Sequence, residues 1–239
     1  MKTKIRKSGW MMVLSLALVT LASCQGGIVG NGKVETRDQK IGNFTRLVIA
    51  GNFHVFLEPS DKPSLRMEMD ENLYDIVKVS EEGSTLRIET RLNILQARDK
   101  NLYIGIKDLE KMELSGAIKM VSDSVLRLGS LNILVTGAAR LDFEIEAKSL
   151  KIDLSGASEC DFRGKVDELR VRLSGAGDID ALDLMARDVV IDMSGAGGAR
   201  VYAKDKLDVS ISGVGSVRYR GEPEIHKNIS GLGSLKRDK

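Results

Sequence analysis

Aromatic side chains are scarce in this chain, at 4% of 239 residues, and proline occurs only three times. An interior built from such a sequence must rely on Leu, Ile, Val and Met, and rigid kinks in the backbone must be few. No apolar run is long enough to cross a bilayer, and there are only two cysteines and two histidines. Glycine is plentiful by contrast, with 24 residues, which indicates many tight corners.

The first residues have the pattern of a secretion signal. Basic residues precede an apolar run from Trp10 to Leu21, which is too short for a membrane span; they are Lys2, Lys4, Arg6 and Lys7. The run ends in Leu-Ala-Ser-Cys at residues 21–24, which resembles a bacterial lipobox. The resemblance implies that residues 1–23 are a lipoprotein signal peptide and that Cys24 is lipidated. The alternative is an ordinary secretory signal followed by a chance cysteine.

Lipidation of Cys24 would anchor the chain in a membrane, because two or more acyl chains, palmitate among them, hold a protein firmly. We therefore expect a protein of the cell envelope that is anchored to the outer membrane. It could face either the cell surface or the periplasm. Loss of the leader removes four of the 36 basic residues and leaves a net charge of −2 against 34 acidic residues. This balance gives no support to nucleic-acid binding. Cys160 is then the remaining free thiol, which excludes a disulfide framework.

A short string recurs along the chain with a nearly fixed period. Its copies are MELSGA, ILVTGA, IDLSGA, VRLSGAG, IDMSGAG, VSISGVG and KNISGLG, with glycines at Gly116, Gly137, Gly156, Gly175, Gly195, Gly213 and Gly231. Successive glycines are 21, 19, 19, 20, 18 and 18 residues apart. Repetition at this period is typical of a solenoid.

Apolar and polar positions alternate on both sides of each glycine. Two residues before the glycine the column is apolar: Leu114, Val135, Leu154, Leu173, Met193, Ile211 and Ile229. Four residues after it the column is again apolar: Met120, Leu141, Cys160, Ile179, Ala199, Val217 and Leu235. A period of two marks a strand with one buried face, and no unit has room for a crossover helix. We predict an all-β fold, a right-handed parallel β-helix with coils of about 18–21 residues.

The organisation along the chain follows from where this pattern is clear. We expect residues 24–40 to be a flexible tether and residues 41–239 to be one solenoid domain. Within it, residues 111–237 form the regular coils and residues 41–110 an irregular N-terminal cap, because terminal repeats must cover the open end of the stack. The stretch RLVIAGNFHVFLEP, residues 46–59, resembles a degenerate first coil with Gly51 at its corner. DENLYDIVKV is expected to form one short helix, and the charges of the final SLKRDK to blunt the other end.

The serine before each corner glycine has two readings, a nucleophile or a structural hydroxyl. A hydrolase elbow needs glycine two residues before the serine, whereas Asp153 and Asp192 stand there. An activating base is also needed, and only His54 and His226 exist, far apart in the chain. We therefore expect a hydroxyl that bonds the backbone at the bend. The Gly-x-Gly strings continue into strands and not into a helix, so phosphate binding is not expected.

Other candidate sites are weaker. Asp178, Asp180 and Asp183 form an acidic cluster near one corner, which is either a calcium site or, by default, a solvated outer face. Cys160 stands in an apolar column and is expected to be a buried side chain. Asp153, Arg172 and Asp192 occupy one outward column and indicate a charge ladder. We predict no catalytic, cofactor-binding or metal-binding residue; a binding patch, if present, would lie near Phe53, Phe56 and Tyr103.

The Ser-Gly-x-Gly corners behind a lipobox, closed by ISGLGSLKR, resemble the head GIN domain family, whose members carry the label of auto-transporter adhesins. The resemblance covers roughly residues 40–237. It implies a β-helical envelope lipoprotein and provides no catalytic residue to transfer. The string CQGGIVGNGK lacks the acidic residues expected after the cysteine of a surface-displayed lipoprotein, so the membrane face stays open.

We therefore expect a non-enzymatic, lipid-anchored solenoid with a binding or scaffolding role, such as adhesion to a glycan or protein surface. One alternative is a periplasm-facing structural or envelope-stress lipoprotein. The second alternative is a polysaccharide-active β-helix enzyme, which would need carboxylates paired across one exposed face. No cofactor is expected in any of the three cases.

Overall fold

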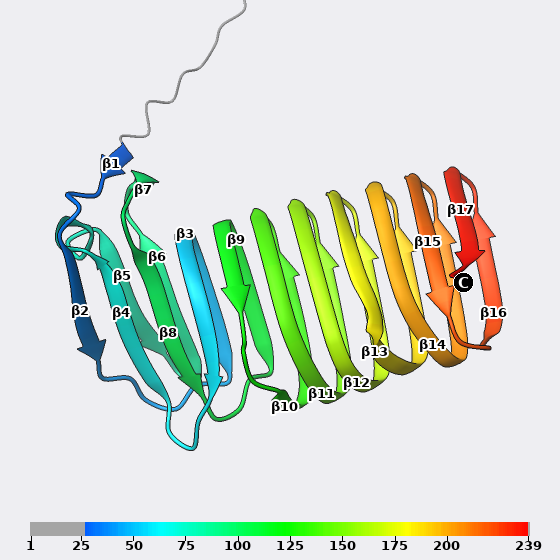
Figure 1. The fold of residues 1–239 in the computed structure, drawn as a ribbon, viewed down its shortest axis with the longest axis horizontal. Helices are drawn as coiled ribbons and strands as arrows, with labels where there is room; N and C mark the ends of the chain where they lie inside the picture. The colour runs from blue at the N-terminus through cyan, green and yellow to red at the C-terminus, as the bar shows by residue number, and fades with distance from the viewer. Residues whose placement is uncertain (1–26, 239) are drawn as a thin grey trace, which may run out of the picture.

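The computed structural model describes residues 27–238, so the predicted signal peptide and Cys24 lie outside the described residues. Figure 1 shows rungs stacked side by side along one long axis. The strands of these rungs are β3 (Arg46–Pro59), β9 (Lys111–Val121), β10 (Leu126–Val135), β11 (Ala138–Leu154), β12 (Ala157–Leu173), β13 (Ala176–Met193), β14 (Ala196–Ile211), β15 (Val214–Arg220), β16 (Glu224–Ile229) and β17 (Leu232–Arg237). All of them pair in parallel, which confirms the predicted β-solenoid.

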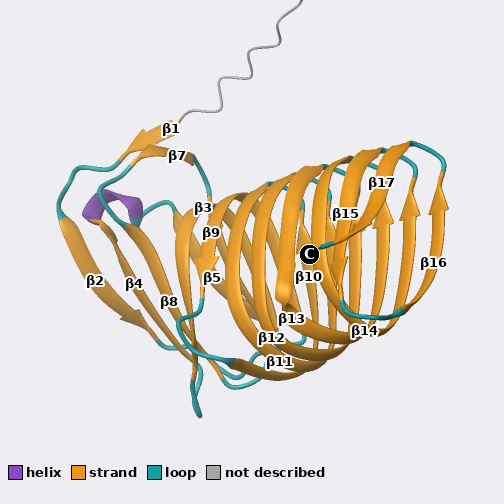
Figure 2. Ribbon diagram, turned by 45° about the vertical axis from the view of Figure 1, so that its right-hand side comes forward, coloured by secondary structure: helices purple, strands orange, loops and turns teal. Residues whose placement is uncertain are grey.

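The corner glycines divide each rung into two faces. We call the residues that follow a corner glycine the post-corner face and those that lead up to the next glycine the pre-corner face. Strands β11 to β14 are 17, 17, 18 and 16 residues long and bend from one face to the other without a break. Figure 2 shows the two faces joined by these bends, with no helix between them.

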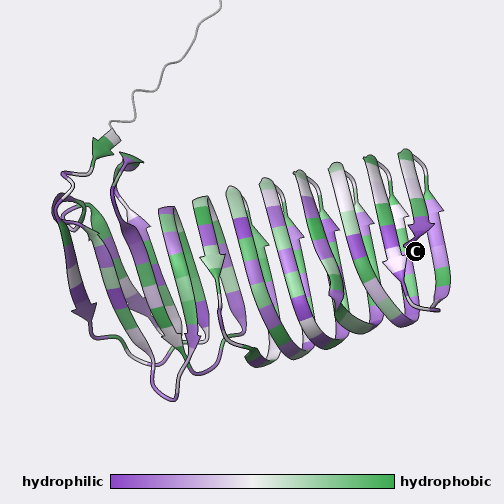
Figure 3. Cartoon of the chain, in the orientation of Figure 1, coloured by the Kyte–Doolittle hydropathy of each residue, from purple (hydrophilic) through white to green (hydrophobic). Residues whose placement is uncertain are grey.

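The interior is the aliphatic column that the sequence predicts. Leu141 lies in register with Met120 on one side and with Cys160 on the other, and Cys160 with Ile179. None of the four is more than 2% exposed, and hydrophobic and hydrophilic residues alternate along the strands in Figure 3. Burial, and then the neighbouring Glu159, raises the pKa of the Cys160 thiol to about 12. The interpretation of Cys160 as a buried apolar side chain is confirmed.

Corner glycines lie directly over one another along the axis. A Cβ on Gly156 would come within 1.7 Å of the carbonyl oxygen of Gly137, and a Cβ on Gly137 within 2.2 Å of that of Gly116. Gly137 and Gly156 do not have positive φ. The close approach of successive rungs is therefore what requires glycine at these corners.

The hydroxyl before the glycine bonds the backbone at three corners. Thr136, Ser155 and Ser174 donate to carbonyl oxygens of the preceding rung, which belong to Leu114, Val135 and Leu154 at 3.5, 3.1 and 3.3 Å. Their own N–H groups donate to the same carbonyls. The structural reading of these hydroxyls is confirmed at these positions.

The N-terminal cap is more regular than its sequence indicates. Its elements are β1 (Gly27–Val29), β2 (Val34–Gln39), β4 (Ser64–Asp70), the 3-10 helix η1 (Glu71–Leu73), β5 (Val77–Glu82), β6 (Thr85–Thr90), β7 (Asn93–Gln96) and β8 (Lys100–Ile106). Strand β3 is in register with β9, and Gly51 lies opposite Gly116. Residues 46–59 therefore form a coil with Gly51 at its corner, as expected, but β6 and β8 make a further rung outside it, so this coil is not the first in the stack.

Chain order and spatial order differ within this cap. Strands β6 and β8 pair in parallel with opposite halves of β3, so the rung that they form lies on one side of β3 and β9 lies on the other. Outside that rung, β4 pairs antiparallel with β8, β2 with β4, and β5 with β6. These antiparallel strands end the parallel stack on both faces, as a solenoid cap must.

Two local predictions are wrong. Residues 27–40 are not a flexible tether, because β1 pairs with β7 and β2 with β4. The stretch DENLYDIVKV forms only the single 3-10 turn of η1 and then enters β5, because the strand pairing of residues 77–82 with β6 outweighs local helix propensity. Among residues 27–238, no helix is long and apolar enough to cross a membrane.

The C-terminal end of the stack is marked by charge in the core columns. Strand β16 pairs only with β14, and β17 only with β15. Lys227 lies in register with the buried Val209, and Arg237 with Tyr219, yet both basic residues are exposed. Inward-facing charge at an edge discourages further strand addition, as expected for SLKRDK.

Candidate functional site

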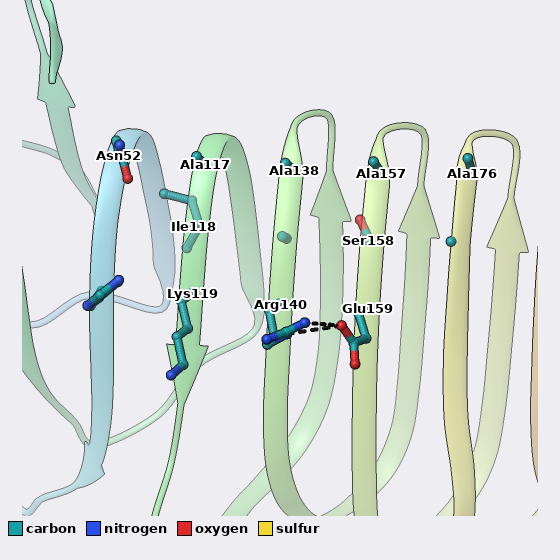
Figure 4. Close-up of a pocket in the computed structure, with 13 residues that line it drawn as sticks. Asn52, Ala117, Ile118, Lys119, Ala138, Arg140, Ala157, Ser158, Glu159 and Ala176 are labelled. Carbon is teal, nitrogen blue, oxygen red and sulfur yellow. Dashed lines mark hydrogen bonds and ion pairs between the residues drawn. The ribbon is translucent and has the colours of Figure 1, made fainter. Parts of the chain in front are cut away.

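A shallow groove runs across successive rungs on the post-corner face, beside the corner. Its volume is about 560 Å³, and it crosses β3, β9, β11, β12 and β13 (Figure 4). The residues directly after the corner glycines line it, and four of them are exposed alanines: Ala117, Ala138, Ala157 and Ala176. These positions point outward, and the small side chains leave room above the strands. We call this feature the alanine groove.

Charged side chains form one wall of the alanine groove. His54, Lys119, Arg140 and Glu159 lie in register on four adjacent strands, two residues beyond the groove's alanine positions. Arg140 donates from Nε to a carboxylate oxygen of Glu159 at 3.0 Å. Lys119 makes no ion pair with another described residue, so its charge stays available to a ligand.

Three basic side chains, His54, Lys119 and Arg140, lie on adjacent strands in this row. Burial, followed by the charges of Lys100 and Lys119, lowers the pKa of His54 below its ordinary value. His54 is therefore neutral at neutral pH, and Lys119 and Arg140 carry the positive charge of the wall. Arg140 is already paired with Glu159, so Lys119 is the side chain whose charge an anionic ligand would neutralise.

The floor of the groove contains one unsatisfied hydroxyl. Ser158 is 7% exposed, and its Oγ has no hydrogen-bond partner among the described residues. Its neighbours in the same inward column are Ala139 and Gly177, which cannot supply one. Buried polar groups are normally paired, but this hydroxyl faces inward with its oxygen fully buried, so it offers no contact to a ligand in the groove.

Asn52 closes the N-terminal end of the groove. Its Oδ1 accepts a hydrogen bond of 2.5 Å from Nζ of Lys100, and its Nδ2 donates to the carbonyl oxygen of Ile94 at 3.1 Å. Burial lowers the pKa of Lys100. The groove therefore has a fixed polar end that joins the coil of β3 to the cap.

The acidic cluster singled out in the sequence does not converge. Asp180 pairs with Arg200 at 2.6 Å and Asp183 faces Arg220 at 3.6 Å, so two of the three carboxylates are used by arginines. Within residues 27–238, no group of three or more metal-ligating side chains comes together.

The expected charge ladder is present in part on the pre-corner face: Asp153, Arg172 and Asp192 lie in register, but among the described residues only the first two form an ion pair with each other. Asp153 lies between Lys151, at 2.9 Å, and Arg172, at 3.6 Å. Cations therefore hold this carboxylate. Retaining and inverting glycosidases instead require a second carboxylate opposite the first. His54 lies in the groove, and His226 lies 3.4 Å from Asp208. Among the described residues, neither histidine forms a hydrogen bond with a corner serine.

The aromatic residues do not form a flat platform for sugar. Phe53 is fully buried. Phe56 and Tyr103 stack on each other with ring centroids 4.8 Å apart, and the guanidinium of Arg66 covers the Tyr103 ring at 4.3 Å. Both faces of Tyr103 are therefore occupied, and the patch expected near these residues is a cross-strand stack.

Sequence reasoning missed the alanine groove. The signal was present in the column three residues after each corner glycine, where Lys119, Arg140 and Glu159 recur beside the small residues. The row of His54, Lys119, Arg140 and Glu159 can be recognised only from the pairing of β3 with β9, because Gly51 and Gly116 are 65 residues apart in the chain.

Comparison with known proteins agrees with the fold. Residues 43–223 match the family model described as "Putative auto-transporter adhesin, head GIN domain". A crystal structure designated a "putative adhesin" from Bacteroides fragilis has a TM-score of 0.83 at 22% identity, over 89% of this chain and 100% of that chain. One designated a "putative lipid binding protein" from Parabacteroides distasonis has a TM-score of 0.67 at 28% identity, over 90% of this chain and 100% of that chain. No curated protein matches the sequence.

Proposed function

The chain belongs to the family described as "Putative auto-transporter adhesin, head GIN domain", and from that premise we propose that it is a lipid-anchored binding protein of the cell envelope. Its solenoid presents a rigid lateral surface to an external ligand, and Cys24 carries the anchor. The lipobox at residues 21–24 supports the anchor, and the family supports the envelope location.

The observation that carries the binding role is the alanine groove. It extends over five strands, so an elongated ligand can contact equivalent positions on several rungs that are about 4.8 Å apart. Its floor is made of small apolar side chains, and its wall offers Lys119, Arg140 and Glu159 as polar contacts. This combination suits a polymer with repeated hydroxyl or acidic groups, such as a surface glycan.

A catalytic role has no comparable support. The family and the matched structures carry adhesin or lipid-binding designations. Glu159 beside the groove and Asp153 on the pre-corner face are each engaged by arginine or lysine. Binding without turnover is therefore the function that the geometry favours.

A glycan array tests the binding role. Ala157→Trp fills the floor of the alanine groove, whereas Ala196→Trp places the same side chain in the same column outside the groove. We expect binding to be lost in the first variant and kept in the second. Equal binding by both variants would place the ligand elsewhere, and chain cleavage of a bound polysaccharide would show an enzyme.

Protease treatment of intact cells tests where the binding face is displayed. A surface adhesin should be removed from intact cells, and a periplasm-facing structural lipoprotein should survive until the outer membrane is opened. Incorporation of labelled palmitate into the wild-type chain, but not into Cys24→Ala, tests the anchor itself. Labelling of both chains would overturn the assignment of Cys24.

A further inference from the structure

An apolar patch lies at the N-terminal end of the solenoid, on β1, β7 and the residue before β7. Val29, Leu92 and Leu95 are 55%, 41% and 68% exposed, and they are three of the seven large hydrophobic side chains that the described part of the chain leaves exposed. The side chain of Leu95 lies over the α-carbon of Gly27. Figure 1 shows β1 and β7 projecting beyond the neighbouring rungs. We call residues 27–29 and 92–96 the apolar ribbon.

The apolar ribbon is firmly attached to the body of the protein. Gly30 donates from its backbone N–H to the carbonyl oxygen of Gln96 at 2.8 Å, and Asn72 donates from Nδ2 to that of Val29 at 2.9 Å. On its inner side, Ile94 is 4% exposed and Ile28 packs against the core. The exposed side chains are therefore held outward by a paired backbone and are not a frayed end.

A buried carboxylate fixes the two segments that flank the ribbon. Asp70, 1% exposed, accepts backbone N–H groups of Gly32, Asp99 and Arg98 at 2.9, 3.1 and 3.3 Å. Gly30 must be glycine here, because a Cβ would lie 2.0 Å from a carboxylate oxygen of Asp70. A buried charge, whose transfer from water is costly, therefore holds the exposed apolar ribbon in place.

The lipidation site is close to this ribbon along the chain. Cys24 precedes Gly27 by three residues, and an extended chain spans at most about 3.6 Å per residue, so the two lie within about 11 Å. The expected tether of residues 24–40 would have allowed a much longer reach, but residues 27–29 and 34–39 are paired strands. An acyl anchor on Cys24 therefore brings the bilayer to the ribbon.

Three basic side chains around the ribbon are available to anionic lipid headgroups. Within residues 27–33 and 91–99 the charged side chains are Lys33, Arg91, Arg98 and Asp99. The carboxylates of Asp70 and Glu71, which hydrogen-bond to Gly32 and Asn31, bring the net charge at this end to zero. None of the three cations forms an ion pair with another described residue. Juxtamembrane basic residues gain from the negative potential of anionic headgroups, and exposed aliphatic side chains gain from the acyl boundary.

We propose that the apolar ribbon is a lipid-contacting surface that seats the N-terminal end of the solenoid in the headgroup region of the membrane. This inference rests on the proposed anchor at Cys24, which supplies the nearby bilayer. The lipid surface is favoured over a second copy of the chain because the ribbon, the anchor site and the unpaired cations coincide at one end. The rigid attachment then fixes the tilt of the whole solenoid on the membrane.

Site-specific fluorescence on the full-length acylated chain tests this seating. Leu95→Cys and, as the matched control, Leu232→Cys are labelled with an environment-sensitive fluorophore. Leu232 is 81% exposed and lies in the last strand, at the opposite end. Native Cys160 is buried with a raised pKa and stays unlabelled. The chains are placed in vesicles of phosphatidylcholine and phosphatidylglycerol, with and without nitroxide-labelled lipid.

We expect the probe at position 95 to shift to the blue and to be quenched by nitroxide lipid several-fold more than the probe at position 232. A probe at position 95 that behaves like one in water would overturn the seating. The mass of the N-terminal peptide reports acylation separately, so an acylated chain with a water-exposed ribbon leaves the anchor intact. A chain without acylation could still insert its ribbon into the vesicles and lose flotation on Leu95→Glu. That result would support the proposed membrane contact of the ribbon and overturn the proposed anchor at Cys24. The probe at position 95 could also be shielded from water in the absence of vesicles, in a dimer that Leu95→Glu dissociates. That result would overturn the proposal, because a second copy of the chain would then cover the ribbon.

Discussion

The side-chain amide of Asn52 donates a hydrogen bond of 3.1 Å to the backbone carbonyl of Ile94. Asn52 is the residue after the first corner glycine and ends the alanine groove, whereas Ile94 is the inner residue of the apolar ribbon. One side chain therefore links the proposed ligand-binding face to the proposed membrane-contacting end. Lys100, which donates to the same amide group, completes a small polar junction between them.

Removing this junction should loosen the ribbon and leave the solenoid intact. Asn52→Ala deletes the donor to Ile94 and the acceptor of Lys100, which we expect to cost about 1–3 kcal/mol locally. Hydrogen exchange should quicken at residues 27–29 and 93–96 and stay unchanged in β11 to β13. Asn101→Ala, which removes hydrogen bonds to Glu68 and Asp99 on the same face, is the control and should leave the ribbon protected. Uniform exchange changes along the solenoid would contradict this local role.

Acid should release the ribbon through Asp70. Burial alone would raise its pKa, but the N–H groups of Gly32, Asp99 and Arg98 more than offset burial and lower the pKa below its ordinary value of 3.8. A lowered pKa in the folded state means that the stabilisation is complete above pH 3.8 and is lost as the pH falls from there through the folded-state pKa. Hydrogen exchange at residues 27–33 and 93–99 should therefore quicken in that window.

Asp70→Asn provides the matched test of this pH dependence. The amide keeps the shape of the side chain but has one acceptor oxygen in place of two and no charge, so the ribbon should be loose at neutral pH. The acid dependence of exchange in these two segments should also disappear. An unchanged acid transition in Asp70→Asn would assign the effect to another group.

The regular coils and their stacked corners are the part of the fold that the sequence predicts best. The column of Met120, Leu141, Cys160 and Ile179 repeats with a fixed period, and each residue contacts its counterparts in the adjacent rungs. Such contacts depend only on local alternation and on the repeat length, which are both visible in the chain. Even the degenerate coil at residues 46–59 could be recognised, because Gly51 preserves the corner.

The cap could not be predicted in the same way. Strands β6 and β8 lie outside β3 although they follow it in the chain, and this order depends on pairing between distant segments. The strand β1 has only three residues, and β2 is an edge strand that leaves Thr36, Arg37 and Asp38 exposed, so neither shows the alternation of a half-buried strand. The site depended on the same step, because His54 joins Lys119 only through the pairing of β3 with β9.

Corner glycines should tolerate no side chain where the rungs are closest. Gly156→Ala places a methyl group 1.7 Å from the carbonyl oxygen of Gly137, so the rungs must separate and the hydrogen bonds beside the corner must stretch. We expect a loss of about 1–3 kcal/mol or more in the free energy of unfolding. Gly129→Ala is the control, since its Cβ would meet nothing within 4 Å and its φ is not positive. Denaturant midpoints measure both, and equal midpoints would contradict the close-approach explanation.

The charge of the alanine groove can be read through His54. Burial contributes most to its lowered pKa, and Lys100 and Lys119 follow. Lys119→Ala removes one neighbouring cation and should raise the pKa of His54, and Lys119→Glu should raise it further. Histidine proton resonances followed by NMR against pH report the value directly. A bound acidic oligosaccharide should also raise the pKa of His54, since an anion beside Lys119 favours the protonated imidazole. If the ligand binds without moving this pKa, the basic wall is not its contact and the binding face must be sought on another side of the solenoid.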